Sequence, residues 1–231
     1  MLLAFDTATP YVTVALHDGE AVVAEARSEH RMRHGEQLAP LVERVLADAG
    51  LVPQDLTALA VGTGPGPFTG LRVGLVTART LSLVLDVPAY GVCTLDAIAL
   101  EAAAGLGGTT DFVVATDARR KEVYLAAYDG QGIRVSGPVV DRPAHVETGL
   151  PVAGEGAVLY PEAFPRPVPP AMPSAGWLAR AVVEERVELT DAEPRYLRRP
   201  DATLPGERKR VSTPRVASSL DSSRQAEPTS G

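Results

Sequence analysis

The sequence predicts an α/β protein built from two related halves. Short apolar runs of strand length alternate with longer segments in which apolar residues recur at helical spacing. One strand-like run, Leu59 to Val61, leads through a turn rich in glycine and proline directly into a helical segment. Asp6 precedes an Asp18-Gly19 turn by twelve positions, and Asp117 precedes Asp129-Gly130 by the same twelve. We infer a duplicated unit, although Asp-Gly turns are common enough for two to match by chance.

The first half opens with three expected strands and a helix. Val12, Val14 and Leu16 alternate with other residues as in a strand, and Asp18-Gly19 supplies a hairpin turn because glycine tolerates positive φ. Apolar residues then recur at helical spacing up to Gly50, which ends the helix. The expected elements are strands at 2–5, 12–16 and 21–27, a helix at 35–49, a strand at 59–61, and helices at 69–85 and 95–104.

The second half repeats the beginning of the first and then becomes irregular. Strands are expected at 112–115 and 122–128, with a further strand after the Asp129-Gly130 turn. The proline-rich residues 151–173 predict an irregular surface loop, and Ser174 is a suitable N-cap for a helix at 175–185. Pro194 to Arg198 is the last expected ordered element, and the polar composition from Thr203 onward predicts disorder. The expected division is therefore 1–105, 106–202 and a disordered tail at 203–231.

Composition excludes several classes of protein. The net charge of −7 argues against a dedicated nucleic-acid binder. Cys93 is the only cysteine, so no intramolecular disulfide can form, and a reducing compartment fits. The first residues lack the basic region of a signal peptide. No apolar run approaches the ~20 residues that span a bilayer, since the most apolar stretch is only Leu81 to Leu85. We therefore expect a cytoplasmic protein.

The thirteen residues from Gly62 to Gly74 form the most informative motif. A glycine-rich turn between a strand and a helix can bind an anion through its backbone N–H groups. A Walker A loop, however, needs Gly-Lys-Ser/Thr where this chain has Gly70-Leu71-Arg72, and a dinucleotide motif needs a glycine where it has Thr69. Spacing alone therefore favours a tight turn between packed elements over a phosphate site.

The helix after this motif carries only two charges between Leu71 and Leu85, which are Arg72 and Arg79. A helix that is apolar nearly all round is buried on more than one side. It is either a central core helix or a helix with one face on its own sheet and another on a partner, which the preceding helix would also contact. The candidate partner-binding residues are Leu38, Leu41, Val42, Val45, Leu71, Leu75, Ala78 and Ser82.

Two pairs of residues are weak candidates for chemistry. His30 and His34 have the spacing of a helical metal pair, but arginines lie between and beside them, which favours a solvated surface. Cys93 and His145 would make a nucleophile and a base, yet no motif surrounds either residue.

Asp6 and Asp117 are stronger candidates. Two acids at the ends of equivalent strands would face one cleft between the two halves, where a nucleotide and its metal could bind. The alternative for each is an Asx-type cap of its own loop.

Four segments together resemble the bacterial TsaB family, formerly called YeaZ. They are Asp6–Thr9, Gly64–Gly74, Asp117–Tyr124 and Pro194–Arg198, and the similarity extends over roughly residues 1–199. The resemblance implies the duplicated, actin-like ATPase (ASKHA) fold. It also implies a role in making N6-threonylcarbamoyladenosine at position 37 of tRNA. In that role TsaB is a non-catalytic subunit that binds and activates its paralogue TsaD, together with the ATPase TsaE.

Two departures bear on what the resemblance implies. The catalytic paralogue carries a zinc-binding His-x-x-x-His, and Thr94 and Ile98 stand where those histidines would fall. We therefore expect no metal or cofactor of this chain's own, with ATP and zinc or iron on partner subunits. Pro67 replaces the serine of the family motif and removes a hydroxyl and a backbone N–H. The remaining anion or nucleotide site would be vestigial and would comprise Asp6, Thr7, Gly64, Gly66 and Asp117.

Three hypotheses stay open from the sequence. The first is the non-catalytic subunit, with a TsaD homologue and a TsaE-type ATPase as partners, tRNA reached through the complex, and a homodimer through the same surface when TsaD is absent. The second is an actin-fold ATPase or kinase, or a metal-dependent protease, that acts alone. The third is a secondary role in direct tRNA binding through the basic residues Arg119, Arg120, Lys121, Arg195, Arg198 and Arg199 and the basic tail.

Overall fold

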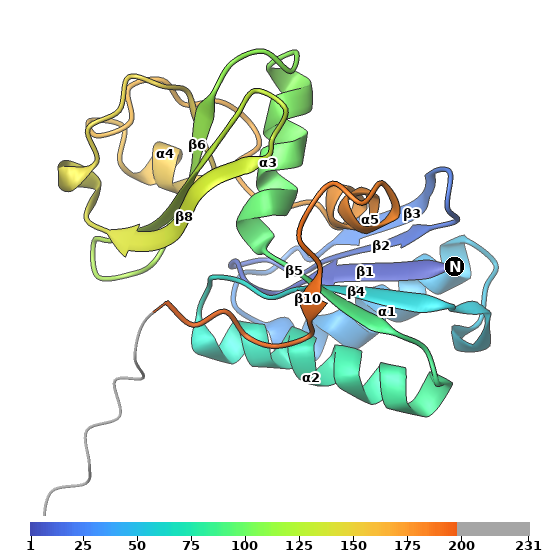
Figure 1. Ribbon diagram of the computed structural model, residues 1–231. Coiled ribbons are helices and arrows are strands. Elements are labelled where there is room, and N and C mark those ends of the chain that lie inside the picture. The colour runs from blue at the N-terminus through green and yellow to red at the C-terminus, as the bar shows by residue number, and fades with distance from the viewer. Residues whose placement is uncertain (198–231) are drawn as a thin grey trace, which may run out of the picture. The chain divides into compact units, whose positions relative to one another are not determined.

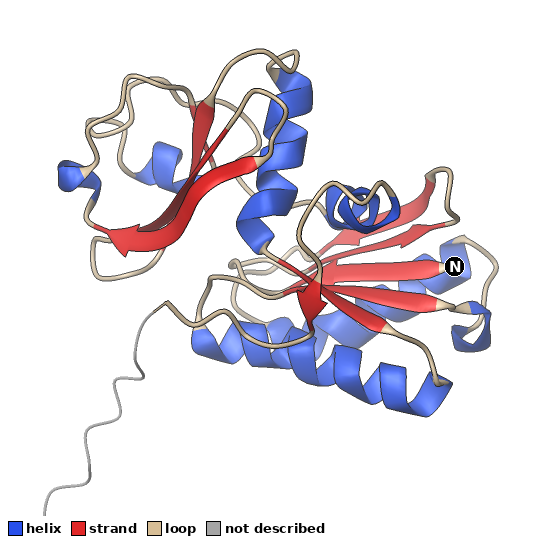
Figure 2. Cartoon of the chain, viewed as in Figure 1, coloured by secondary structure: helices blue, strands red, loops and turns tan. Residues whose placement is uncertain are grey.

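The computed structural model describes residues 1–197 and arranges them as two β-sheets with helices on their faces (Figures 1 and 2). The first sheet has the strand order β10-β5-β4-β1-β2-β3, and the second has the order β8-β7-β6-β9. The strands are β1 (Leu2–Asp6), β2 (Thr13–His17), β3 (Val22–Arg27), β4 (Ala58–Gly62), β5 (Ala89–Val92), β6 (Phe112–Asp117), β7 (Val123–Tyr128), β8 (Arg134–Asp141), β9 (Val152–Ala153) and β10 (Thr190–Asp191). The helices are α1 (His34–Asp48), α2 (Phe68–Leu85), α3 (Thr94–Gly105), α4 (Glu155–Leu159) and α5 (Ala175–Val183), with short 3-10 turns η1 (Pro53–Asp55) and η2 (Pro143–His145).

Both sheets contain the same four-strand unit. In the order β3-β2-β1-β4 the first three strands are antiparallel and β4 is parallel to β1. The order β8-β7-β6-β9 repeats this arrangement, with β9 parallel to β6. Asp6 and Asp117 are the last residues of the equivalent strands β1 and β6. The predicted duplication is confirmed, because the matching spacing marks equivalent positions in two copies of one unit.

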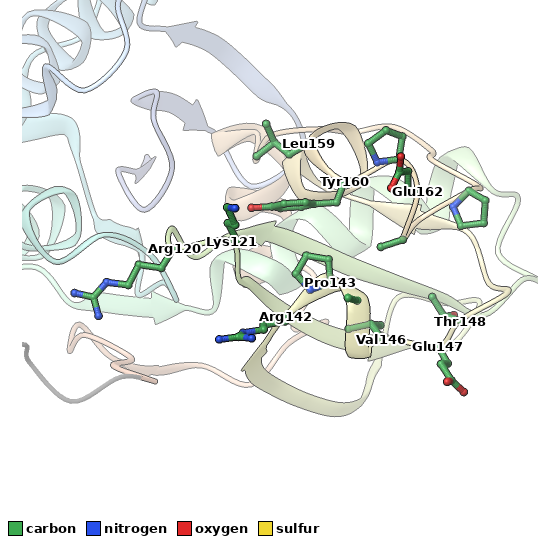
Figure 3. A pocket seen from close by; sticks show the side chains of 14 residues that line it. Arg120, Lys121, Arg142, Pro143, Val146, Glu147, Thr148, Leu159, Tyr160 and Glu162 are labelled. Carbon is green, nitrogen blue, oxygen red and sulfur yellow. The ribbon is translucent and has the colours of Figure 1, made fainter.

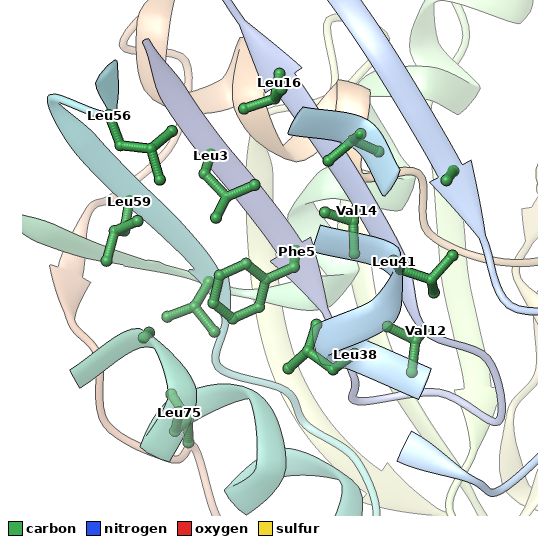
Figure 4. Close-up of a cluster of buried hydrophobic side chains, with 14 of the residues drawn as sticks. Leu3, Phe5, Val12, Val14, Leu16, Leu38, Leu41, Leu56, Leu59 and Leu75 are labelled. Atoms are coloured by element: carbon green, nitrogen blue, oxygen red, sulfur yellow. The ribbon is translucent and has the colours of Figure 1, made fainter. Parts of the chain in front are cut away.

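The first sheet is covered on both faces. Successive side chains of a strand point to opposite faces, so Leu3 and Phe5 of β1 join a core with α1 and α2, which Figure 4 shows. Leu2 and Ala4 point the other way and pack with α3 and α5. Burial on both sides explains why β1 is a continuous apolar run rather than an alternating one.

The second sheet is also covered on both faces. Phe112 and Val114 of β6 face α3, whereas Val113 and Ala115 face α4 and the buried Phe164. Helix α3 contributes residues to this core and to the core of the first sheet. The expected boundary at residue 105 coincides with the end of this shared helix and stays a prediction. The expected tail at 203–231 lies outside the described residues.

The expectation of an irregular surface loop at 151–173 is wrong. This segment contains β9 and α4, and Phe164 is fully buried. Strands β5 and β10 were also not expected. Such elements have two to five residues, too few to show a hydrophobic period. They form because they pair with a neighbouring strand or pack against a core that is built from distant parts of the chain.

Helix α2 is long and apolar enough to cross a membrane by length and composition alone, with 18 residues and a mean hydropathy of 1.3. This corrects the expectation that no segment approaches that length. The helix is packed on one side, however, and its buried residues are Gly70, Leu71, Gly74, Leu75 and Ala78. Val73, Leu81 and Leu85 are partly buried against the same core. Val76, Leu83 and Val84 are exposed.

Candidate functional site

Four of the five glycines in the Gly62–Gly74 motif recur every fourth residue and lie against Asp6, Thr7 or Ala8 at the end of β1, whereas Gly64 lies against Leu71. A Cβ added at Gly62 or Gly66 would come within 3.0 Å of Asp6 or Ala8. At Gly70 and Gly74 it would lie 2.5 Å from the carbonyl oxygen and the hydroxyl of Thr7. Real Cβ atoms do not approach other atoms this closely, so each position requires glycine. The glycine spacing therefore allows close packing, which agrees with the mismatch between this motif and the known phosphate-loop patterns.

Thr7 joins this segment to α2. Its hydroxyl donates to the carbonyl oxygen of Gly70 (2.8 Å) and accepts from the N–H of Gly74 (3.1 Å). The carbonyl oxygens of Thr7 and Ala8 lie nearest to Gly70 and Gly66. An anion at this turn would therefore meet carbonyl oxygens, which repel it. The backbone of Thr7 and Ala8 therefore fills the space beside Gly66 where a vestigial anion site was expected, and the N–H of Gly64 donates to the Thr94 hydroxyl.

Asp6 and Asp117 do not share a cavity, contrary to the expectation from their equivalent positions. Asp6 is fully buried: its carboxylate accepts from the Thr94 hydroxyl and from the N–H of Ala8, both at 2.6 Å. Asp117 accepts from the backbone N–H of Arg119 (2.8 Å) and pairs with its guanidinium (3.2 Å). The cavity beside Asp117 measures only ≈ 10 Å³ and does not include Asp6. Each acid therefore caps its own loop.

The buried carboxyl of Asp6 predicts a dependence of stability on pH. Burial raises its pKa, and the hydrogen bonds from Thr94 and Ala8 oppose this effect only in part. A raised folded-state pKa means that the folded protein holds the proton over a pH range in which the unfolded chain has lost it. Stability from this group is therefore complete below the unfolded pKa and is lost as pH rises toward the folded pKa.

We expect Asp6→Asn to remove this dependence. The measured quantity is the difference in free energy of unfolding between the wild type and the variant. This difference should fall as pH rises above the ordinary pKa of aspartate, by about 1.4 kcal/mol for each unit by which the pKa of Asp6 is raised. Urea unfolding between pH 4 and pH 8 measures it. Asp18→Asn is the control with the opposite sign, because hydrogen bonds from Ala21 and Glu20 lower the pKa of that exposed carboxyl. Parallel curves for wild type and Asp6→Asn would contradict the prediction.

Thr94 and Ile98, which stand where the resemblance places metal-binding histidines, hold other positions. The Thr94 hydroxyl accepts from the N–H of Gly64 (3.2 Å) besides donating to Asp6. Ile98 is fully buried in the core between α3 and the second sheet. Within residues 1–197, no three His, Cys, Asp or Glu side chains gather in a way that could hold a metal ion.

The histidine and cysteine candidates are also structural. His34 is buried, and its Nε2 lies 2.7 Å from the carbonyl oxygen of Thr9, so the expectation of a solvated pair is wrong for this residue. His30 is exposed, as expected. Burial raises the pKa of the Cys93 thiol to about 12, which leaves it unreactive at neutral pH. His145 is paired with Asp141 instead (3.0 Å).

The candidate partner-binding residues are, for the most part, not on the surface. Only Val42 and Ser82 are partly exposed, and Ser82 donates to the carbonyl oxygen of Val87. The other six lie in the core between the first sheet, α1 and α2: Leu38, Leu41, Val45, Leu71, Leu75 and Ala78. A partner cannot touch these six, because the chain's own sheet covers them. The set must therefore be corrected to other positions of α2.

The outer face of α2 carries a strip of exposed aliphatic side chains that the sequence pattern did not single out. Val76, Leu83 and Val84 are 60, 84 and 72 % exposed, and we call these three residues the α2 strip. Single exposed apolar residues are common on surfaces. Three on one helix, opposite a face that is already buried, form a candidate contact surface.

The segment before the end of the described chain packs along the same helix. Tyr196 stacks on Phe68, with ring centroids 5.3 Å apart, and the Arg72 guanidinium lies 3.6 Å from the Phe68 ring centre. Arg79 donates to the carbonyl oxygen of Ala192 (2.9 Å). Arg72 also donates through its Nε to the Tyr196 hydroxyl (3.3 Å), so both charges of α2 bind the chain's own C-terminal segment.

Comparisons with known proteins agree with this architecture. The family model described as TsaD, tRNA N6-adenosine threonylcarbamoyltransferase, matches residues 24–203. The chain is 40 % identical over 134 residues to the Escherichia coli (strain K12) tRNA threonylcarbamoyladenosine biosynthesis protein TsaB. It also superposes on YeaZ from Pseudomonas aeruginosa with a TM-score of 0.70 and 29 % identity, covering 85 % of this chain and 99 % of that one. The chain belongs to the TsaB (YeaZ) family.

Membership of the TsaB family confirms the actin-like α/β fold that the resemblance implied. A second Pseudomonas aeruginosa structure, of an uncharacterized protein with similarity to peptidase YEAZ, gives a TM-score of 0.72 at 30 % identity and 99 % coverage of that chain. An uncharacterized protein of Mycobacterium tuberculosis (strain ATCC 25618 / H37Rv) is 46 % identical over 87 % of this chain and 93 % of its own length. The match to Escherichia coli TsaB is shorter and spans 57 % of each chain.

Proposed function

We propose that this protein is a non-catalytic subunit in the synthesis of N6-threonylcarbamoyladenosine in tRNA, and that it binds and activates a TsaD homologue. The observation that carries the proposal is the α2 strip, an exposed apolar surface on a helix already packed on its other face. The names of the curated TsaB relatives support the pathway. The match to the TsaD family model supports a partner of the same fold.

The physical case for a partner rests on the cost of leaving the α2 strip in water. Burying a Val or Leu side chain contributes about 1.5–3 kcal/mol. Three such side chains on one helix face would therefore supply several kcal/mol to a complex. Helix α2 already lies on its own sheet through Leu71, Leu75 and Ala78. A partner on the opposite face would contact it without disturbing that core.

The interior of the chain supports a non-catalytic role. Asp6 is buried and capped, and the ≈ 10 Å³ cavity beside Asp117 is about the size of one water molecule. A nucleotide is far larger than this space. Thr94 and Ile98 occupy core positions rather than presenting ligands. ATP and zinc or iron would accordingly belong to partner subunits.

We expect the double substitution Val76→Glu with Leu83→Glu to abolish co-purification with a co-expressed TsaD homologue. Two carboxylates in an apolar contact lose their hydration without gaining partners, which should lower the recovered complex by about 10-fold or more. The matched control is Val135→Glu with Val139→Glu on β8, which adds the same two carboxylates at exposed side chains (66 and 51 %). Circular dichroism should show both variants folded.

Two results would contradict the proposal. The first is full recovery of the complex with the double variant, which would remove the α2 strip from the interface. The second is Mg-ATP turnover by the isolated chain that is lost in Asp6→Asn, which would favour an enzyme that acts alone. Reconstitution of tRNA modification by TsaD and TsaE with and without this chain tests the role itself. Gel filtration without TsaD tests the expected homodimer.

A further inference from the structure

Helix α2 carries two arginines and no acidic residue, and only one of these arginines is paired with a carboxylate. Arg79 lies 3.2 Å from the Glu193 carboxylate. The polar and ring contacts of the Arg72 side chain within residues 1–197 are the Tyr196 hydroxyl and the Phe68 ring, and neither of these carries a charge. The exposed surface of α2 therefore holds one positive charge that the described residues leave unbalanced.

Arg72 lies on the same face of α2 as the α2 strip. Val76 follows it by four residues and Leu83 by eleven, and both spacings return to the same side of an α-helix. Arg72 and Leu83 are about 16 Å apart along the helix axis, which is well within the width of an ordinary protein interface. A partner that covers the α2 strip would therefore also meet Arg72.

The C-terminal segment holds the Arg72 guanidinium in place. Figure 1 shows the chain after β10 running along α2. Tyr196 stacks on Phe68 and accepts a hydrogen bond from Arg72 Nε (3.3 Å), while the guanidinium carbon lies 3.6 Å from the Phe68 ring centre. The terminal nitrogens Nη1 and Nη2 have no hydrogen-bond partner within the described residues. Arg198 and Arg199, which the sequence grouped as candidates for tRNA binding, lie outside those residues.

We call Phe68, Arg72 and Tyr196 the Arg72 cluster. Phe68 and Tyr196 are 43 and 41 % exposed, and every other aromatic side chain within residues 1–197 is buried or half-buried. Aromatic and arginine side chains contribute most of the binding energy in many protein interfaces. The two most exposed aromatic rings of the described chain thus lie beside the one unbalanced arginine of α2, on the face that carries the α2 strip.

The two acids of the C-terminal segment do not neutralise Arg72. Asp191 and Glu193 line a hollow beside Leu83, toward the other end of α2. Glu193 is already paired with Arg79. The charge beside Phe68 therefore has a single sign, and it favours an acidic group as its partner.

The large hollow beside the second sheet differs in this respect. It measures ≈ 1030 Å³ and is open to solvent (Figure 3). Its lining contains basic residues and acidic residues together, namely Arg120, Lys121, Arg142, Glu147 and Glu162. A charged occupant would be attracted by some of these groups and repelled by others, so the charge of this hollow favours no class of ligand.

We propose that the Arg72 cluster binds a carboxylate, supplied by an Asp or Glu side chain of the TsaD homologue that covers the α2 strip. The identity of this partner rests on the proposed function. A guanidinium enclosed in an apolar contact loses its hydration, which is costly unless an opposite charge replaces the water. Nη1 and Nη2 donate to the two carboxylate oxygens, in the paired geometry that arginine favours. Phe68 and Tyr196 act as positioning residues for the guanidinium.

The test is the affinity of the full chain for the purified TsaD homologue, measured by titration calorimetry. Arg72→Glu should weaken the complex by about 30-fold or more, because it removes one member of an enclosed charge pair. Arg72→Lys keeps the charge but not the planar pair of donors, and it should weaken the complex by about 5-fold. Tyr196→Phe keeps the ring but removes the hydroxyl that holds Nε, and we expect a loss of about 3-fold.

The matched control is Arg180→Glu. Arg180 is also an exposed arginine over an aromatic ring, with its guanidinium carbon 4.9 Å from the Trp177 ring centre. It belongs to α5, which packs on the opposite face of the first sheet from α2. This variant should bind the TsaD homologue within about 2-fold of the wild type, and all four variants should unfold near the wild-type urea concentration.

Salt dependence separates a charge pair from simple packing. The affinity of the wild type should fall as salt rises from 50 to 500 mM, because ions screen an interface charge pair at its rim. Arg72→Gln, which removes the charge at similar length, should reduce that fall. An arginine that served only to pack against Phe68 would leave the salt dependence unchanged when replaced by glutamine.

Two results would overturn the inference. The first is equal affinity of Arg72→Glu and Arg180→Glu for the TsaD homologue. The second is weaker self-association of Arg72→Glu in gel filtration with unchanged affinity for the TsaD homologue, which would assign the carboxylate to a second copy of this chain.

Failure of this inference and failure of the proposed function give different results. If Val76→Glu with Leu83→Glu loses the TsaD homologue while Arg72→Glu keeps wild-type affinity, the α2 strip is the interface and only the carboxylate contact is wrong. If the wild-type chain does not bind the TsaD homologue at all, the proposed function is wrong, and this inference fails with it.

Discussion

The Leu75→Glu substitution is expected to unfold the protein, whereas Val76→Glu, at the next residue of the same helix, is expected to leave it folded. Leu75 is 3 % exposed and packs in the core between α2 and the first sheet. Removing a buried leucine costs about 2–5 kcal/mol, and a carboxylate without a partner in that space adds a further penalty. A domain of this size is stable by only about 5–15 kcal/mol.

Urea unfolding followed by circular dichroism measures the contrast. Val76 is 60 % exposed, so a glutamate there remains in water and should change the free energy of unfolding by no more than about 0.5 kcal/mol. If Leu75→Glu unfolds at the wild-type urea concentration, α2 is not packed as described. The contrast also decides how the interface can be tested. Loss of a complex in Leu75→Glu or Leu41→Glu would report unfolding, since both leucines are core residues.

Gly66→Ala is expected to cost about 1–3 kcal/mol or more through a steric clash alone. An added Cβ would come within 3.0 Å of the backbone carbonyl group of Ala8. A backbone group cannot move aside as the end of a flexible side chain can, so the loop after β1 must shift. Gly66 is not among the residues with positive φ, so backbone strain does not contribute. The change isolates the packing role that we assign to the motif.

Gly35→Ala, in contrast, is expected to raise the free energy of unfolding. Nothing lies within 4 Å of a Cβ at Gly35, which is in the first turn of α1. Alanine is a better helix residue than glycine, so this variant should gain about 0.5–1 kcal/mol. Thermal and urea unfolding of the two variants beside the wild type measures both signs. A tolerated Gly66→Ala would mean that the glycine spacing has another purpose, and the anion site would again need an explanation.

The Gly62–Gly74 motif shows how far the sequence alone could go. Its residues identify the turn between β4 and α2, and a residue-by-residue comparison shows that it does not match known phosphate loops. The sequence does not show which residues the glycines contact. Asp6, Thr7 and Ala8 are more than fifty residues away in sequence and reach this turn only because β1 pairs with β4. The same pairing gives Asp6 its burial and its raised pKa.

The partner surface shows the opposite case, in which the sequence indicated the right helix and the wrong residues. A helix that is apolar nearly all round has no pronounced polar side, so its pattern does not say which side meets the sheet. The structure turns Leu71, Leu75 and Ala78 inward and leaves Val76 and Leu83 outside.

The sequence by itself determined the α/β class, the duplicated unit and the position of most helices, because these follow from hydrophobic period, turn residues and repeated spacing within short stretches of chain. Only the tertiary structure decided that Asp6 and Asp117 do not meet in a cleft. It also decided that the motif's glycines make room for neighbouring protein residues rather than for a phosphate, and that the α2 strip is the exposed face of its helix. Each of these depends on how one helix or strand is rotated against another. That rotation is set by contacts between residues distant in the chain, which no local pattern records.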